Sequence, residues 1–204
     1  LEAAVLVLRD AHPVWGARKI GALLQRQGLE PPAVSTIHQI LKRGGRIAPE
    51  PASPGKAFGR FERPEPNELW QMDFKGWVKL TTGERCHPLT VIDDHSRFCP
   101  CLKACADQTG STVKAHLTET FRRHGLPLAF FVDNGAPWGL ASGETWTKLG
   151  VWLLKLGVQV LHSRPYHPQS RGKIERFHRT LAAEVFDLAV FDSLQKTQAA
   201  FDQW

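Results

Sequence analysis

The succession of hydrophobic patterns after residue 68 constrains the fold of this chain more than any other feature of its sequence. Three strand-like segments come first, and segments that alternate between helical and strand-like periodicity follow them. In chain order they are strands at 69–80, 88–92 and 98–104, a helix at 109–124, a strand at 128–132, a helix at 144–156, a strand at 158–161 and a helix from 169 onward. This order predicts an α/β domain in which an antiparallel meander is extended by strands that alternate with helices.

The first 42 residues show a different pattern, that of three short helices. The first two are expected at 2–10 and 18–27, and the third follows two prolines with Ser35 as its expected N-cap. Three short helices with tight connections form a helix-turn-helix arrangement, whose last helix can enter the major groove of DNA. Lys42 and Arg43 would then contact phosphates. The alternative interpretation is a helical bundle that only packs on a neighbouring domain.

A basic linker separates the two patterns. Residues 43–67 contain five prolines, four glycines and five basic residues, and they show no periodicity. We therefore predict a partial helix-turn-helix region at 1–42, this linker at 43–67, a core at 68–190 and the start of a C-terminal region at 191–204. The element order of the core is that of a ribonuclease-H-like fold, so we expect a five-stranded mixed sheet with flanking helices.

The overall composition narrows the class of partner and the cellular compartment. The net charge of +6 favours polyanionic partners such as nucleic acid. No apolar run reaches the roughly 18 residues that a membrane span requires, so we expect no membrane partner. The cysteines form no small disulfide framework, which favours a reducing, cytoplasmic location. They fall on expected strands without paired Cys-x-x-Cys clips, so we interpret them as thiols at least half buried and not as zinc ligands: Cys86, Cys99, Cys101 and Cys105.

Three carboxylates occupy positions that favour chemistry. Asp73 interrupts a strand-like segment, Asp133 follows a very apolar strand, and Glu175 lies in the first turns of the last helix. The expected fold brings them together, because its first and fourth strands are neighbours and the last helix packs beside them. Clustered carboxylates repel one another unless a cation lies among them, and oxygen ligands suit Mg²⁺ or Mn²⁺. Two such ions can stabilise the attacking and leaving oxygens of an in-line phosphoryl displacement. Alternatively, Asp133 is a turn residue and Glu175 forms a surface ion pair with Arg179.

The segment around Glu175 is strongly basic. Residues 161–180 contain five Lys or Arg, three His and Glu175 as the single acid. A lone carboxylate among cations is expected where a metal binds the carboxylate and the cations hold phosphates. The expected DNA contacts are Lys173, Arg179, Arg171 and Arg176, together with Tyr166 and His167 on a loop where they could stack on an unpaired base. His178 could equally be a plain surface residue.

Several short motifs carry a resemblance to a known family. The segment YHPQSRGKIERFHRTL at 166–181 closely resembles the last block of the catalytic core of DDE transposases and retroviral-type integrases. LWQMDF at 69–74 and FVDNG at 131–135 match the other two blocks, and DDHSR at 93–97 matches a turn of that core that is not normally catalytic. WQMDFKG at 70–76 and LQKTQAAFD at 194–202 look most like the IS481 group of bacterial insertion-sequence transposases, near the IS3 group.

This resemblance implies a transposase that cleaves DNA at the ends of an insertion sequence and transfers the strands to target DNA. It implies Asp73, Asp133 and Glu175 as the metal-binding catalytic triad, Mg²⁺ or Mn²⁺ as cofactor, and a homo-oligomer on DNA at the bacterial nucleoid. Three alternatives stay open. A ribonuclease-H-type nuclease would need Glu119 at the metal, and a retroelement integrase would normally carry a zinc module with cysteines, which residues 1–66 lack. A non-catalytic DNA-binding relic would bind DNA without cleaving it.

Overall fold

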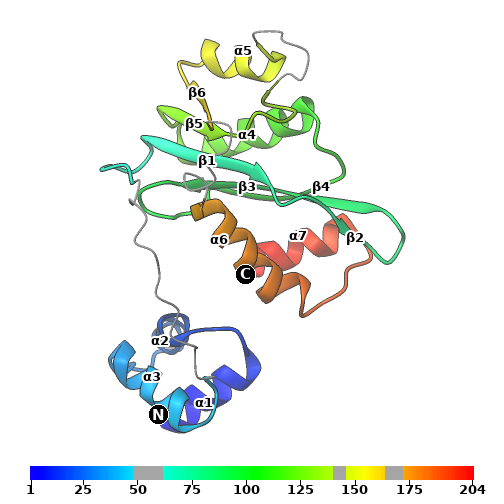
Figure 1. Ribbon diagram of the computed structural model, residues 1–204. Coiled ribbons are helices and arrows are strands. Elements are labelled where there is room, and N and C mark those ends of the chain that lie inside the picture. The colour runs from blue at the N-terminus through cyan, green and yellow to red at the C-terminus, as the bar shows by residue number, and fades with distance from the viewer. Residues whose placement is uncertain (48–61, 140–145, 164–171) are drawn as a thin grey trace. The chain divides into compact units, whose positions relative to one another are not determined.

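The computed structural model describes residues 1–47, 62–139, 146–163 and 172–204 (Figure 1). These residues belong to two compact units, Leu1–Ala57 and Phe58–Trp204, so the boundary between the units falls inside the expected linker. Within the described ranges, every helix is too short or too polar to cross a membrane.

The first unit contains three helices, as the sequence predicts. They are α1 (Glu2–Ala11), α2 (Ala17–Arg26) and α3 (Val34–Arg43). One apolar cluster joins them, and its buried members are Val5, Ile20, Leu24, Ile37, Ile40 and Leu41. The expected N-cap at Ser35 is wrong, because Ala33 is the N-cap of α3 and offers no side-chain hydrogen bond. The extended backbone of Ala33, which follows two prolines, begins this helix in place of a capping hydroxyl.

The second unit is built on a mixed sheet, as expected. Its strands are β1 (Leu69–Phe74), β2 (Val78–Lys79), β3 (Arg85–Asp93), β4 (Cys101–Cys105), β5 (Ala129–Val132) and β6 (Gln159–His162). The order is β2-β3-β1-β5-β6, and β4 pairs with β3. β1, β3 and β4 form the antiparallel meander, whereas β5 and β6 continue the sheet in parallel from β1.

The sheet has six strands where five were expected, because the long first strand is interrupted. Lys75 still donates its N–H to the carbonyl of Pro88 on β3, but Gly76 has φ of +95° and turns the backbone. β2 then resumes pairing with β3 in a register shifted by one residue. The interruption follows directly after Asp73 and Phe74, so it lies beside the first candidate acid.

Helices cover both faces of the sheet, and the alternation of side chains along the strands explains which helix covers which face. α4 (Gly110–His124) and α5 (Lys148–Lys155) pack on one face, in a cluster that includes Trp70, Met72, Val91, Val113, Leu117, Phe130, Val132 and Leu153. On the other face, α6 (Gly172–Leu181), the π-helical turn η2 (Ala182–Phe186) and α7 (Leu194–Gln203) pack in a second cluster that includes Leu102, Ala104, Phe177, Leu181, Val185 and Phe201. Figure 1 shows these two helical layers on opposite sides of the sheet.

α7 belongs to the same compact unit as the sheet and protects its edge. The Gln198 side-chain oxygen accepts the N–H of Ala104 at 2.9 Å, and its Nε2 donates to the carbonyl of Leu102 at 3.1 Å. Both backbone groups lie on the outer side of β4, which among the strands of the described ranges pairs with β3 alone. One side-chain amide thus replaces a neighbouring strand at an edge that would otherwise offer unpaired groups.

Candidate active site

The parallel pairing of β1 with β5 places the first two candidate acids side by side. Leu69 pairs with Ala129 and Gln71 with Phe131, a constant offset of 60 residues. The same offset brings Asp73 level with Asp133, which directly follows β5. Neighbouring strands lie about 4.8 Å apart, so this offset, continued two residues beyond the last pair, Gln71 with Phe131, would place the two carboxylates near each other.

The backbone around Asp133 is fixed by local hydrogen bonds. Its Oδ1 accepts the N–H of Gly135 at 2.9 Å, and the carbonyl of Asp133 accepts a hydrogen bond from Nδ1 of His162 at 2.8 Å. Asn134 donates from Nδ2 to the carbonyl of Ser163 at 3.0 Å. Asp133 therefore does act as a turn residue, because one of its carboxylate oxygens accepts a turn hydrogen bond. This turn holds the carboxylate at the end of β5.

Asp73 lies on the face of the sheet that α6 covers. Its side chain is 17% exposed, and its Oδ2 is 4.0 Å from Nδ1 of His178, whose side chain is 12% exposed. The expectation that His178 could be a plain surface residue is wrong. The helical period gives the signal that was missed, because His178 lies four residues after Ile174 and three before Leu181, and both are buried.

Helix α6 carries Glu175 on the flank nearest β5. Lys173 extends from this helix to Asp94, just beyond β3, with its Nζ 2.6 Å from Oδ1. Residues two apart on an α-helix point to nearly opposite sides, so Glu175 lies on the flank away from β3. β1 lies between β3 and β5 in the sheet, so that flank is the one nearest Asp133.

Asp73 and Asp133 thus belong to neighbouring strands and Glu175 to the helix that covers the face of Asp73, and that these three acids form one site stays a prediction. Glu175 is exposed, and it precedes His178, the neighbour of Asp73, by one helical turn. Among the described residues, no three His, Cys, Asp or Glu side chains are arranged to hold a metal ion. The donors that meet here are carboxylate oxygens, the ligand type that suits Mg²⁺ and Mn²⁺.

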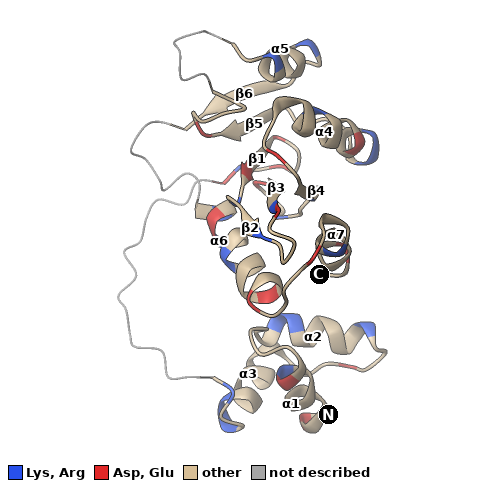
Figure 2. Cartoon of the chain, turned by 90° about the vertical axis from the view of Figure 1, so that its right-hand side faces the viewer, with Lys and Arg blue, Asp and Glu red and all other residues tan. Residues whose placement is uncertain are grey.

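The residues expected to contact DNA fall into four groups. Arg176 and Arg179 are exposed on α6, and Figure 2 shows basic residues along this helix. Lys173 instead forms the ion pair with Asp94 inside the protein. In the first unit, Lys42 is exposed in the last turn of α3, and Arg43 pairs with Glu2 at 3.1 Å on the surface. The remaining three expected contacts lie outside the described residues: Tyr166, His167 and Arg171.

Glu119 lies away from this corner, against the opposite face of the sheet. It pairs with Lys103 of β4 at 3.5 Å and with Arg123, one turn along α4, at 3.1 Å. α4 packs on the face that bears Trp70 and Met72, whereas Asp73 points to the other face. The nuclease alternative, which needs Glu119 beside Asp73, thus loses its structural basis.

The cysteines are buried thiols, as interpreted from the sequence. All four are free, and Cys99 alone is only partly buried. Burial raises the pKa of Cys86 and of Cys101 to about 11, and that of Cys99 and of Cys105 to about 12. Such thiols stay protonated near neutral pH and are poor nucleophiles.

Comparisons with known proteins identify the family to which the sequence of the second unit is similar. A model described as "Integrase core domain" matches residues 63–168, and a second model of that description matches residues 156–204. A Pro-Pol polyprotein of simian foamy virus type 3 is 33% identical over 118 residues, which cover 57% of this chain and 10% of that protein. An uncharacterized 39.2 kDa protein of insertion element IS476 from Xanthomonas euvesicatoria is 25% identical over 212 residues, which cover 100% of this chain and 58% of that protein. The chain therefore spans less than two thirds of either relative.

A solved structure supports the fold. A chain of the cryoEM structure of the simian T-cell lymphotropic virus intasome, in complex with PP2A regulatory subunit B56 gamma, superposes with a TM-score of 0.55. The match covers 97% of this chain and 66% of that chain, with 18% sequence identity. Together with the mixed sheet and its two helical layers, this likeness confirms the expected ribonuclease-H-like core.

Proposed function

Because the chain belongs to the integrase core domain family, we propose that it is the transposase of a bacterial insertion sequence, which cleaves DNA strands at the ends of the element and joins them to target DNA. The observation that carries the proposal is the register of β1 and β5, which supports a place for Asp73 beside Asp133, with Glu175 on the helix that covers the face of Asp73. The similarity to two insertion-element proteins along the whole chain supports transposition as its role.

In this proposal Asp73, Asp133 and Glu175 would hold Mg²⁺ or Mn²⁺, as one ion or as a pair. Such ions, when bound, supply charge stabilisation to the attacking and leaving oxygens of a phosphodiester. The pairing of β1 with β5 supports the pairing of the first two carboxylates, and His178 lies 4.0 Å from Asp73, where it would help to position that carboxylate. Glu175 is exposed, so its side chain can change rotamer to reach a bound ion.

The basic residues then hold the nucleic acid. Arg176 and Arg179 are exposed on the helix that carries Glu175 and would contact phosphates close to the reacting bond. Arg171, Tyr166 and His167 would contact DNA from the adjoining segment. In the first unit, α3 would enter the major groove as the last helix of a helix-turn-helix, with Lys42 and Arg43 on the backbone. Cutting two ends together requires at least two copies on DNA, in the bacterial cytoplasm at the nucleoid.

The direct test is nicking and joining of DNA by this chain, with Mg²⁺ or Mn²⁺, beside its Glu175→Gln variant. We expect activity that depends on the divalent ion and that falls by about a hundredfold or more in the variant, the scale of losing a group that stabilises transition-state charge. Equal activity in both proteins would contradict the triad. DNA binding by both proteins without any cleavage would favour the non-catalytic relic.

A further inference from the structure

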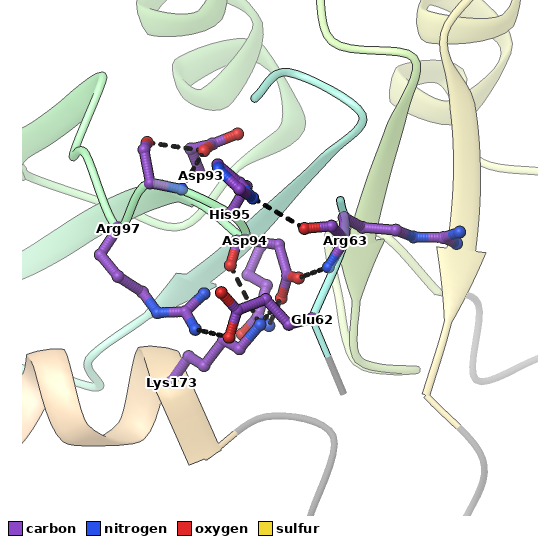
Figure 3. Close-up of polar contacts among 9 residues, drawn as sticks. Glu62, Arg63, Asp93, Asp94, His95, Arg97 and Lys173 are labelled. Carbon is purple, nitrogen blue, oxygen red and sulfur yellow. Dashed lines mark hydrogen bonds and ion pairs between the residues drawn. The ribbon is translucent and has the colours of Figure 1, made fainter. Parts of the chain in front are cut away.

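Asp94 is the most enclosed charged side chain near the candidate active site. Its side chain is 0% exposed and accepts three hydrogen bonds from three separate parts of the chain (Figure 3). The donors are the N–H of Arg63 at 2.8 Å, Nε2 of Gln71 at 2.8 Å and Nζ of Lys173 at 2.6 Å. A carboxylate removed from water is tolerated only when it is paired and hydrogen-bonded in this way.

The ammonium group of Lys173 pairs with this carboxylate and is largely shielded from solvent. Its side chain is 15% exposed, and its Nζ donates to the carbonyl of Asp94 at 3.0 Å as well as to Oδ1. Burial lowers the pKa of Lys173, while the hydrogen bond to Asp94 opposes that change. An ammonium with two acceptors inside the protein is poorly placed to be a phosphate contact, in contrast to the exposed Arg176 and Arg179.

The turn that carries Asp94 is itself braced. Its neighbour Asp93 accepts hydrogen bonds from the N–H of Asn67 at 2.8 Å and from the N–H and hydroxyl of Ser96 at 2.7 and 2.6 Å. Arg97 pairs with Glu62 at 2.9 Å (Figure 3). These hydrogen bonds hold Asp94 in place relative to the sheet, so a residue that pairs with Asp94 is held in place as well.

The ion pair ties the first turn of α6 to the residue that follows β3. Lys173 is the second residue of α6 and Glu175 is the fourth, so both lie in its first turn. With Lys173 tied toward β3, Glu175 is directed toward β5 and Asp133. We propose that Asp94 and Lys173 form an anchor that positions Glu175 for the reaction, which makes them positioning residues and not DNA contacts. This inference rests on the proposed function, since it assigns a metal-binding role to Glu175.

The test measures binding of Mn²⁺ to the full chain by electron paramagnetic resonance, without DNA or turnover. The proteins compared are the wild type, Asp94→Asn, Lys173→Met and the double variant, with folding verified by circular dichroism. We expect Mn²⁺ binding to weaken about tenfold in each single variant, the lower end of the loss seen when a group that orients a ligand is removed. The double variant should be no weaker than the singles, because the two residues act as one anchor.

A second readout separates positioning from phosphate contact. The dependence of DNA affinity on salt should keep its slope in Lys173→Met, whereas Arg179→Met should reduce the slope by about 0.9, the value for one lost phosphate contact. Glu119→Gln is the matched control, because it removes an acid with two cationic partners on the opposite face of the sheet and should leave Mn²⁺ binding unchanged.

Wild-type Mn²⁺ affinity in folded Asp94→Asn or Lys173→Met would overturn the inference, as would a reduced salt slope in Lys173→Met. If a single variant does not fold, Mn²⁺ binding is measured on the double variant, which leaves neither charge buried without its partner. Wild-type Mn²⁺ affinity in the double variant would also overturn the inference. Failure of the proposed function looks different: the wild type would bind no Mn²⁺, or Glu175→Gln would bind it equally well.

Discussion

Replacing Gln198 by alanine tests how far the edge of the sheet depends on a single side chain. The substitution removes the hydrogen bonds to Ala104 and Leu102 of β4 and a third to Asp202, one turn along α7. Alanine has at least the helix propensity of glutamine, so the helix itself does not suffer. The expected effect therefore belongs to the contact between α7 and β4.

The size of this effect follows from the burial of the groups left behind. Ala104 and Leu102 are half-buried, so water can replace only part of the lost bonding. With about 1 kcal/mol for each of the two bonds to β4, the expected loss is about 2 kcal/mol, and incomplete solvation raises it toward about 3 kcal/mol. For a unit of this size a loss of about 2 kcal/mol lowers Tm by about 4–8 °C.

Urea unfolding and hydrogen exchange at the amide of Ala104 together measure this effect. We expect the exchange protection of that amide to fall at least about tenfold, equivalent to about 1.4 kcal/mol. Gln195→Ala is the control, because Gln195 is exposed on the same helix. A Gln198→Ala variant with unchanged Ala104 protection, and with stability within about 0.5 kcal/mol of the control, would refute the reasoning.

Three further predictions follow from single features. Glu119→Gln should retain the nicking activity of the wild type, since Glu119 pairs with Lys103 and Arg123 away from Asp73; strong loss of cleavage would restore the nuclease alternative. Burial raises the pKa of Asp93, but hydrogen bonds from Ser96 and Asn67 outweigh it and hold the pKa below its usual value. Its contribution to stability is therefore present above the unfolded pKa of about 3.9 and is lost as the pH falls through the folded pKa, so the difference in unfolding free energy between wild type and Asp93→Asn should shrink from about pH 5 to about pH 3. A difference that stays constant over that range would contradict this account. Finally, Ellman's reagent at neutral pH should titrate no thiol rapidly in the native chain and four after denaturation, because burial raises the pKa of every cysteine; a fast native thiol would show that one of them is accessible.

Much of the fold could be predicted because its elements carry strong local signals. The four-residue spacing of Val113, Leu117 and Phe121 marks α4, and the apolar run before Asp133 marks β5. The interruption after Phe74 could not be placed, because Gly76 lies in a segment whose apolar residues continue on both sides. The prediction of Ser35 as N-cap used the average preference of serine for that position. In this chain the backbone is still extended at Ala33, so α3 begins two residues earlier than such a cap would require.

The candidate acids can be selected from the sequence, whereas the contacts of the residues around them cannot. Asp73, Asp133 and Glu175 stand out because each carboxylate interrupts an apolar or basic context. The partner of Lys173 could not be inferred, since Asp94 lies 79 residues earlier and reaches Lys173 only through the packing of α6 across the sheet. A basic residue in a basic segment looks like a DNA contact until its partner is known. The contact of His178 with Asp73 likewise depends on how α6 packs across the sheet.

The constant offset between β1 and β5 also bears on how such a protein can diversify. Between Asp73 and Asp133 the chain forms a hairpin, a third strand and α4, yet the spacing of the two acids depends only on the pairing of two neighbouring strands. The turn Thr81–Glu84 is exposed, so residues can be inserted there without moving either carboxylate. Lineages can thus remodel this hairpin while the pairing of β1 with β5 stays intact, and an engineered label placed in the same turn would leave that pairing undisturbed.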